Sequence, residues 1–242
     1  MNKFVDIIYV WSKGDELMKK TTKAIFLIII TIFIVVSADF LGKGYNLYRL
    51  ATSEIGVDEK ITEIKQSADY ISLNDISKDF INALVSVEDH RFYNHNGIDY
   101  ISIIRASYNN LKAGKIVMGG STITQQLAKN LFFTNEQSYE RKIAELFVVD
   151  KLERKYSKDE ILELYVNVIY YGDGYYGIKN ASLGYFGELP SEININQSIL
   201  LAGLPQAPEA YSLSKHYDKA IKRGRQVMAS MIRNEIDVKL EY

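Results

Sequence analysis

The 242-residue sequence contains no cysteine, which excludes a disulfide-stapled scaffold, a thiolate zinc site and a cysteine nucleophile. Three prolines are too few for a Pro-rich linker and favour a helical chain, and three scattered histidines lack the HExxH spacing of a zinc site. No charge excess is present either, because 29 Lys and Arg face 30 Asp and Glu. The balance is typical neither of nucleic-acid binding nor of disorder, so we expect no nucleic-acid partner.

One long hydrophobic run is present near the N-terminus. Residues 24–38 read AIFLIIITIFIVVSA, and the run continues to Leu41 with Asp39 as its one charge. As a helix these 18 residues are about 27 Å long, close to the roughly 30 Å of a hydrocarbon core. Lysines precede the run, so the positive-inside rule places residues 1–23 in the cytoplasm and the chain after about residue 42 outside.

The alternative interpretation of this run is a cleaved signal peptide, since residues 36–38 (Val-Ser-Ala) could serve as a cleavage site. The segment before the run is long for a signal peptide and mixes both charge signs. We therefore expect an uncleaved transmembrane anchor over residues 24–42.

The remaining sequence predicts a mainly α domain over residues 77–235, preceded by a linker over residues 43–76. Residues 55–64 are ambiguous between a strand and a short helix. No run alternates over many residues, so a large sheet is not expected. Ser157 and Glu160 form a capping box before one helix. Helical patterns cover residues 77–93, 99–111, 121–132, 138–154, 161–168, 178–186, 197–204 and 218–235.

The first chemically informative cluster is EDHRFYNHNG at residues 88–97. Glu88, Phe92 and His95 lie at i, i+4 and i+7, so they share one face if the helix persists. Glu88 follows the apolar stretch 83–87, and an apolar environment raises the pKa of a carboxyl group toward a value useful for acid–base catalysis. The alternative is a solvated helix end.

The second cluster is GGSTITQQLAKN at residues 119–130. Thr122, Gln125, Gln126 and Lys129 are spaced to form one polar helix face. Glycines allow close backbone approach, and a helix N-terminus favours anions, so the pattern suits a phosphate next to a sugar. The alternative is a neutral surface face. The sequence has no GxxxxGK[ST] motif, so a nucleotide-driven kinase is not supported.

The third cluster is Arg141, Lys142 and Glu145. Arg141 and Glu145 could simply pair across one helical turn. Beside Lys129, however, the cluster offers further cations, and arginine suits bidentate phosphate binding. Farther along, Glu163 and Asn167 are four residues apart and are expected to hold a turn rather than to perform chemistry.

Five motifs follow one another along the chain, namely EDHRFYNHNGID, GGSTITQQLAKN, RKIAE, KDEILELYVNVIYYG and LLAGLPQAP. Taken in this order, they resemble the peptidoglycan glycosyltransferases of glycosyltransferase family 51. The resemblance runs from about Ser77 to Met231. It implies a mostly helical, lysozyme-like fold with a small jaw subdomain beside a cleft, in a monofunctional enzyme that has one N-terminal transmembrane helix.

The resemblance also implies a reaction. The enzyme would polymerise lipid II with inversion and release undecaprenyl pyrophosphate. Glu88 corresponds to the general base, and Glu145 to a second functional glutamate that organises the phosphates or a divalent ion. Cations that correspond to pyrophosphate ligands are Lys129, Arg141 and Lys142. Residues that correspond to those shaping or lining the cleft are Asp89, Phe92, His95, Thr122, Gln125 and Gln126.

Cofactors, partners and location follow from the same resemblance. No cofactor is required, and a divalent cation, Mg²⁺ or Mn²⁺, is an optional bridge to the pyrophosphate. The implied partners are lipid II, lipid-linked glycan, the bilayer and other cell-wall synthesis proteins. The implied location is the bacterial cytoplasmic membrane, with the catalytic domain on the extracytoplasmic side.

The sequence departs from the family pattern at Gln137, where many members carry an arginine, so we expect weaker phosphate contact there. Ser212 to Lys215 fits SxxK, but KTG is absent and the chain leaves no room for a penicillin-binding fold, so we interpret the match as a coincidence. Two other functions stay open. A glycan hydrolase could use two carboxylates, and a catalytically idle membrane scaffold could recruit wall-synthesis partners.

Overall fold

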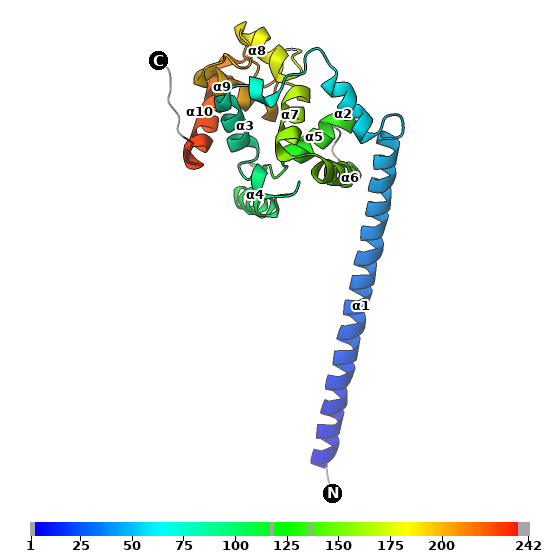
Figure 1. Ribbon diagram of the computed structural model, residues 1–242. Coiled ribbons are helices and arrows are strands. Elements are labelled where there is room, and N and C mark those ends of the chain that lie inside the picture. Colours follow the sequence, from blue (N-terminus) through cyan, green and yellow to red (C-terminus); the bar gives the residue numbers. More distant parts are fainter. Residues whose placement is uncertain (1–2, 117–118, 135, 137, 237–242) are drawn as a thin grey trace.

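The computed structural model describes residues 3–116, 119–134, 136 and 138–236 as a helical body with one long projecting helix (Figure 1). Across the described residues there is no strand, only one isolated antiparallel bridge between Tyr170 and Tyr176. The predicted mainly α fold is confirmed. The α-helices are α1 Lys3–Ala51, α2 Val57–Lys65, α3 Lys78–Glu88, α4 Tyr100–Ala113, α5 Ile123–Phe132, α6 Tyr139–Lys155, α7 Lys158–Val168, α8 Ile178–Phe186, α9 Ile195–Gly203 and α10 Tyr217–Arg233.

The helix α1 projects from the body like a rod, with the N-terminus at its far end (Figure 1). Residues 21–51 have a mean hydropathy of 2.8 in their most apolar part, none of which is buried against the rest of the protein. This stretch is long and apolar enough to cross a membrane. The helix continues past the expected anchor boundary at residue 42, so the first part of the expected linker is helical as far as Ala51.

The C-terminal turns of α1 pack against α6. The rings of Tyr45 and Tyr48 lie 5.3 and 5.5 Å from the ring of Phe147. Gly44 faces Ile143 so closely that a Cβ at this position would overlap the isoleucine side chain. The glycine therefore allows the two helices to approach, and α1 is docked on the domain rather than hinged beside it.

The ambiguous segment 55–64 is largely helical, since α2 occupies residues 57–65. Val57 and Ile61 are buried, and α2 packs on α7. This helix therefore belongs to the packed body.

Glu163 and Asn167 of α7 hold residues 70–73, the segment that follows α2, against the body. This is the turn-holding role that their spacing predicted. Glu163 accepts hydrogen bonds from the Tyr70 hydroxyl at 2.6 Å and from the Leu73 amide at 2.8 Å. The Asn167 side chain accepts from the Ile71 amide and donates to the Ile71 carbonyl, both at 2.9 Å. Neither side chain is left for chemistry.

The core consists of two groups of helices. α3 packs with α9 and α10, while α5 packs with α6 and α7. Phe80 and Leu84 of α3, Leu127 of α5 and Tyr165 of α7 are fully buried. This packing brings the C-terminal end of α3 and the N-terminal half of α5 into contact, as the hydrogen bond between Glu88 and Gln126 shows.

The capping residues explain where several helices begin. The predicted capping box of Ser157 and Glu160 is present at the start of α7. Asp99 caps α4 by accepting hydrogen bonds from the amides of residues 101 and 102, and Gly114 ends that helix with φ 62°. α4 buries only Ala106 and exposes large apolar side chains to solvent, namely Tyr100, Ile101, Ile103, Ile104, Tyr108 and Leu111.

The SxxK match forms a structural cluster around Asp173. Asp173 adopts φ 52° in the loop after α7, a conformation that aspartate tolerates better than most residues. Its carboxylate accepts hydrogen bonds from Ser212 at 2.7 Å, Ser214 at 2.8 Å and Tyr185 at 3.0 Å, and lies 3.3 Å from the Lys215 ammonium. Ser212 and Lys215 both face Asp173, so this segment fastens a loop.

We expect Asp173→Asn to lower the midpoint of thermal unfolding at pH 7. Burial alone would raise the pKa of the Asp173 carboxyl, but hydrogen bonds from Ser212, Ser214 and Tyr185 and the Lys215 ammonium hold it well below its usual value. The stabilisation is therefore present above the unfolded pKa of about 3.9 and is lost as the pH falls below it.

The measurement is a series of melting curves from pH 7 to pH 3, in which the gap between wild type and variant should narrow on the acid side. Asp150→Asn is the control, because its ion pair with Arg154 is exposed and worth little. A gap that stays constant with pH would contradict the assignment to the charge.

Candidate active site

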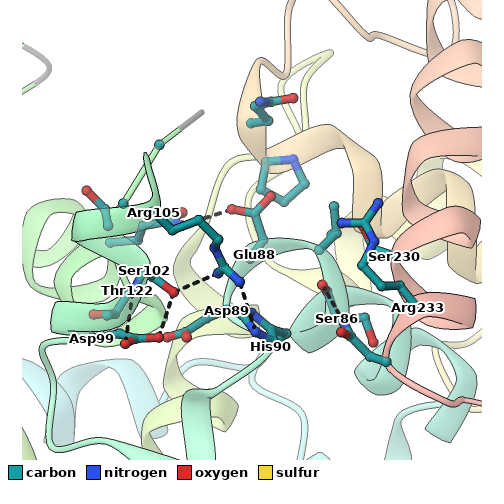
Figure 2. Close-up of a pocket in the computed structure, with 18 of the residues that line it drawn as sticks. Ser86, Glu88, Asp89, His90, Asp99, Ser102, Arg105, Thr122, Ser230 and Arg233 are labelled. Carbon is teal, nitrogen blue, oxygen red and sulfur yellow. Dashed lines mark hydrogen bonds between the residues drawn. The ribbon is translucent and has the colours of Figure 1, made fainter. Parts of the chain in front are cut away.

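A pocket of about 500 Å³ opens where the ends of α3 and α10 meet the start of α5 (Figure 2). Glu88 lies near its centre, with Arg105 and Thr122 on one side and Ser230 and Arg233 on the other. The charged and amide side chains that line it are Glu88, Asp89, His90, Asp99, Arg105, Gln126, Lys129, Gln206, Arg223, Arg233 and Asn234. The pocket thus holds carboxylates and several cations together.

Glu88 is the last residue of α3, and its side chain is only 9% exposed. Its Oε2 accepts a hydrogen bond from Gln126 Nε2 at 2.9 Å, and its Oε1 lies 3.5 Å from Arg223 Nη2. Burial raises the pKa of the Glu88 carboxyl, while Gln126 and Arg223 oppose the rise and Asp89 adds to it. A raised pKa makes the carboxylate a stronger base, as the sequence interpretation expected.

The helical face expected for Glu88, Phe92 and His95 is not formed, because α3 ends at Glu88. Asp89 leaves the helix with φ −159° and ψ 73°. Phe92 is fully buried in a short 3-10 turn, Phe92–Asn94, with the Lys158 ammonium 4.6 Å from its ring centre. His95 instead places Nε2 3.0 Å from both carboxylate oxygens of Asp89. Phe92 and His95 support the turn from behind and do not line the pocket.

Asp89 joins the end of α3 to the start of α5. Its Oδ2 accepts a hydrogen bond from the Ile123 amide at 3.0 Å. Together with His95, this bond engages both oxygens of a carboxylate that is 6% exposed. Asp89 therefore sets the position of Glu88 relative to α5.

The polar face expected on α5 divides into two parts. Thr122 and Gln125 are 2% and 4% exposed and cap the helix reciprocally, and the Thr122 hydroxyl also donates to the Gly97 carbonyl at 2.7 Å. Gln126 and Lys129, one and two turns farther on, line the pocket. The i, i+3 spacing of Thr122 and Gln125 thus serves a capping box, and of this pair Thr122 also lines the pocket.

Lys129 connects the pocket to the third cluster. Burial lowers the pKa of its ammonium, and Arg141 and Lys142 lower it further, whereas Glu145 raises it. The side chain is half-buried, with positive charge gathered around it. Such a site favours a ligand that brings negative charge.

Glu145 is fully buried and holds two cations. Its carboxylate accepts from Arg141 and, at 2.7 Å, from the Lys142 ammonium, which also lies 3.2 Å from the Ser121 hydroxyl. Arg141 and Glu145 do form the ion pair that spacing allowed, with the Glu145 carboxylate fully buried and Lys142 partly exposed. None of the three lines the pocket directly.

The residues around Glu145 do not fit a resident metal ion, because the carboxylate oxygens already accept from two cations. Potential ligand atoms of Asp89, His95 and Asp99 do lie within 4.8 Å of one another. However, Asp99 caps α4 and lies 3.1 Å from the Arg91 guanidinium. The oxygens of this second group are likewise engaged.

Sequence reasoning missed Arg223, which is 8% exposed and faces Glu88 from α10. A signal was present, because Arg223 lies on the same stripe as the buried residues Ala220, Val227 and Met231. A lone arginine on an apolar face needs a partner in the interior. Arg105 and Arg233 were missed as pocket-lining residues too. Gln137 lies outside the described residues.

Comparison with known proteins agrees with this geometry. The family model described as "Transglycosylase" matches residues 57–232. A monofunctional glycosyltransferase of Staphylococcus haemolyticus is 38% identical over 229 residues, which are 92% of this chain and 83% of that protein.

Two larger relatives are also similar. Penicillin-binding protein 1A of Aquifex aeolicus is 47% identical over 163 residues, or 67% of this chain. Penicillin-binding protein 1F of Bacillus subtilis is 39% identical over 225 residues, or 88% of this chain. The chain spans 22% and 31% of their lengths. The resemblance predicted from the ordered motifs is therefore confirmed, and the chain belongs to the transglycosylase family.

Proposed function

We propose that this chain is a peptidoglycan glycosyltransferase that polymerises lipid II into glycan strands with inversion and releases undecaprenyl pyrophosphate. The observation that carries the proposal is a buried carboxylate, Glu88, in the same pocket as the half-buried Lys129. The carboxylate suits removal of a proton, and the ammonium suits a pyrophosphate. Family membership supports the same chemistry.

In the proposed reaction, Glu88 takes the proton of the 4-hydroxyl of the acceptor's GlcNAc. The hydroxyl oxygen then forms a bond to the anomeric carbon of the donor, and the bond from that carbon to the pyrophosphate breaks. Gln126 occupies one oxygen of Glu88, so the other is the proton acceptor. A base of raised pKa that is held within reach of the hydroxyl is the requirement for this step.

The leaving pyrophosphate needs charge stabilisation rather than a proton. Lys129 provides a half-buried positive charge, and a charge partly removed from water acts more strongly than one in bulk water. Arg141 and Lys142 add positive charge behind it, and Glu145 orients both. Any divalent cation would arrive bound to the pyrophosphate of the substrate, and no step of the proposed reaction depends on it.

We also propose that α1 spans the cytoplasmic membrane, with residues 1–23 inside and the helical body outside. The apolar, unburied residues of α1 support a spanning segment. The exposed apolar side chains of α4 support contact with a lipid surface next to the pocket, because Arg105 of the same helix lines that pocket. A substrate with a lipid tail and a pyrophosphate would meet both features.

A glycan hydrolase is less well supported. Hydrolysis of a glycosidic bond uses two carboxyl groups on either side of the bond. Glu145 is fully buried against Arg141 and Lys142 and does not line the pocket, so it is not available as the second group. Asp89 and Asp99 do line the pocket, but they are engaged with His95 and the Ile123 amide and with the start of α4 and Arg91.

The test is to incubate the detergent-solubilised full chain with labelled lipid II and to resolve the products on a gel. A ladder that lysozyme digests is the expected result. Digestion of added glycan without a ladder would favour the hydrolase. A folded protein that turns over neither substrate would favour the scaffold.

Lys129→Ala is expected to lower the polymerisation rate about 100-fold, the order found when one group that stabilises developing charge is removed. The fold should persist, because the variant removes a half-buried ammonium that other cations surround. The measurement is initial rate against lipid II concentration, with the exposed Lys219→Ala on α10 as the control. Unchanged kinetics would show that the phosphates bind elsewhere.

A further inference from the structure

Gln126 of α5 and Arg223 of α10 hold the Glu88 carboxylate, one at each oxygen. Gln126 of α5 donates to Oε2 at 2.9 Å. The Tyr165 hydroxyl of α7 donates to the Gln126 carbonyl oxygen at 2.8 Å, and Tyr165 is fully buried. Because the amide oxygen is already engaged, the amide nitrogen is turned toward Glu88. Oε2 therefore has a fixed donor.

Arg223 of α10 approaches the other oxygen, Oε1, at 3.5 Å. Its guanidinium is itself held, since Nε donates to the Gly203 carbonyl at 3.3 Å and Nη1 to Gln226 Oε1 at 3.2 Å. A Cβ at Gly203 would lie 2.9 Å from Arg223 Cγ, so α9 passes close to the arginine stem. The charge thus has a set position beside the carboxylate.

Of the charged side chains that line the pocket, Arg223 and Asp89 act on the Glu88 carboxyl most directly. Asp89, the next residue in the chain, disfavours the charged form of Glu88, while the neighbouring side chains Gln126 and Tyr165 are uncharged. Within the described part of the chain, Arg223 is the cation in contact with Glu88. A buried carboxylate without a nearby cation takes up a proton instead of staying charged.

The length of the contact matters as well. At 3.5 Å the guanidinium gives charge attraction but only a weak hydrogen bond. Oε1 therefore keeps lone pairs that can accept a proton from a substrate hydroxyl, whereas Oε2 is occupied by Gln126. An arginine in close bidentate contact would instead cover both oxygens.

We propose that Arg223 is a positioning residue for the general base: with Gln126 it holds the Glu88 carboxylate charged and in one orientation, with Oε1 as the oxygen that takes the acceptor's proton. This inference rests on the proposed function. Arg223 lies 135 residues after Glu88 in the sequence, so a residue of α10 helps to set the basicity of the site.

The first test is the pH profile of kcat/KM for lipid II polymerisation by the full chain in detergent. Arg223→Met, which removes the charge and keeps most of the stem, should move the acid limb up by about one pH unit or more. At pH values on the acid limb the activity should fall about tenfold, which is the equivalent of one unit, and should recover as the pH rises.

Arg223→Lys restores a cation and should bring the limb part of the way back. Arg225→Met is the matched control, because Arg225 lies exposed on the same helix, and it should keep the wild-type profile. Melting curves of all variants establish that they are folded. If Arg223→Met lowers kcat/KM by the same factor at every pH, the proposal is overturned and Arg223 has only a packing role.

The second test needs no turnover. The carboxyl carbons of glutamate are labelled with ¹³C, and the Glu88 signal is identified by its loss in Glu88→Gln. Its titration midpoint should rise in Arg223→Met and stay unchanged in Arg225→Met. An unchanged midpoint in Arg223→Met would overturn the inference. If the Glu88 midpoint rises in Arg223→Met but the wild-type protein does not polymerise lipid II, the proposed function is refuted and the positioning role of Arg223 stands.

Discussion

Glu88→Gln is expected to abolish lipid II polymerisation, with a loss of about 10³-fold or more, while the protein stays folded. A general base contributes roughly 10² to 10⁴ in rate, and the amide cannot accept the proton of the acceptor hydroxyl at neutral pH. The glutamine oxygen can still accept the hydrogen bond from Gln126, so the packing at the end of α3 is retained. The measurement is the initial rate of ladder formation, with a melting curve for each protein.

The control for this variant is Glu59→Gln, an equal change of charge on the exposed side of α2. It should leave the rate unchanged. The wild-type rate should decrease as the pH is lowered, because the base must be deprotonated. The midpoint of this decrease should lie above the pKa of an ordinary glutamate, because burial raises the pKa of Glu88. A Glu88→Gln protein that builds ladders at the wild-type rate would move the base elsewhere.

Glu145→Ala is expected to lower the free energy of unfolding by about 3 kcal/mol and to reduce polymerisation as well. Glu145 is fully buried, and the change leaves Arg141, whose side chain is 14% exposed, without its counter-charge. Breaking a buried ion pair in this way costs about 3–5 kcal/mol. Lys142 is 42% exposed and can turn to water, so we expect the lower end. Urea denaturation monitored by circular dichroism measures the loss.

A double variant separates the two effects of Glu145. Glu145→Leu combined with Arg141→Met replaces the buried pair by apolar side chains and should recover most of the stability. It should not recover polymerisation, because the variant lacks the Arg141 guanidinium and the carboxylate that orients Lys142. Recovery of both would show that the cluster serves the fold alone, and an unchanged unfolding energy in Glu145→Ala would contradict the burial argument.

Local sequence patterns predicted most of the helices. The 3.6-residue periodicity and the capping residues are short-range signals, and they placed α5, α6 and α7 within a few residues of their observed bounds. The apolar stretch before Glu88 likewise indicated a carboxyl group in a poorly hydrated environment. In each case the cause lies within one or two helical turns of the effect.

The features that were missed depend on partners far along the chain. Periodicity continued the helix to residue 93, but Asp89 bonds with His95 and with the Ile123 amide and the chain leaves the helix after Glu88. The contact of Arg223 with Glu88 spans 135 residues and needs α3, α9 and α10 to be packed first. Thr122 and Gln125 are different, since the capping-box spacing was present in the sequence and could have indicated their role.

The docking of α1 on α6 has a consequence for how the protein meets its substrate. The helix runs without a break from its apolar stretch to the contacts of Tyr48 with Phe147, so there is no slack between anchor and domain. A flexible linker would let the pocket sample many heights above a bilayer. With α1 in the membrane as proposed, the pocket instead keeps one height and one tilt, and its encounters with a lipid-borne substrate become collisions within a plane.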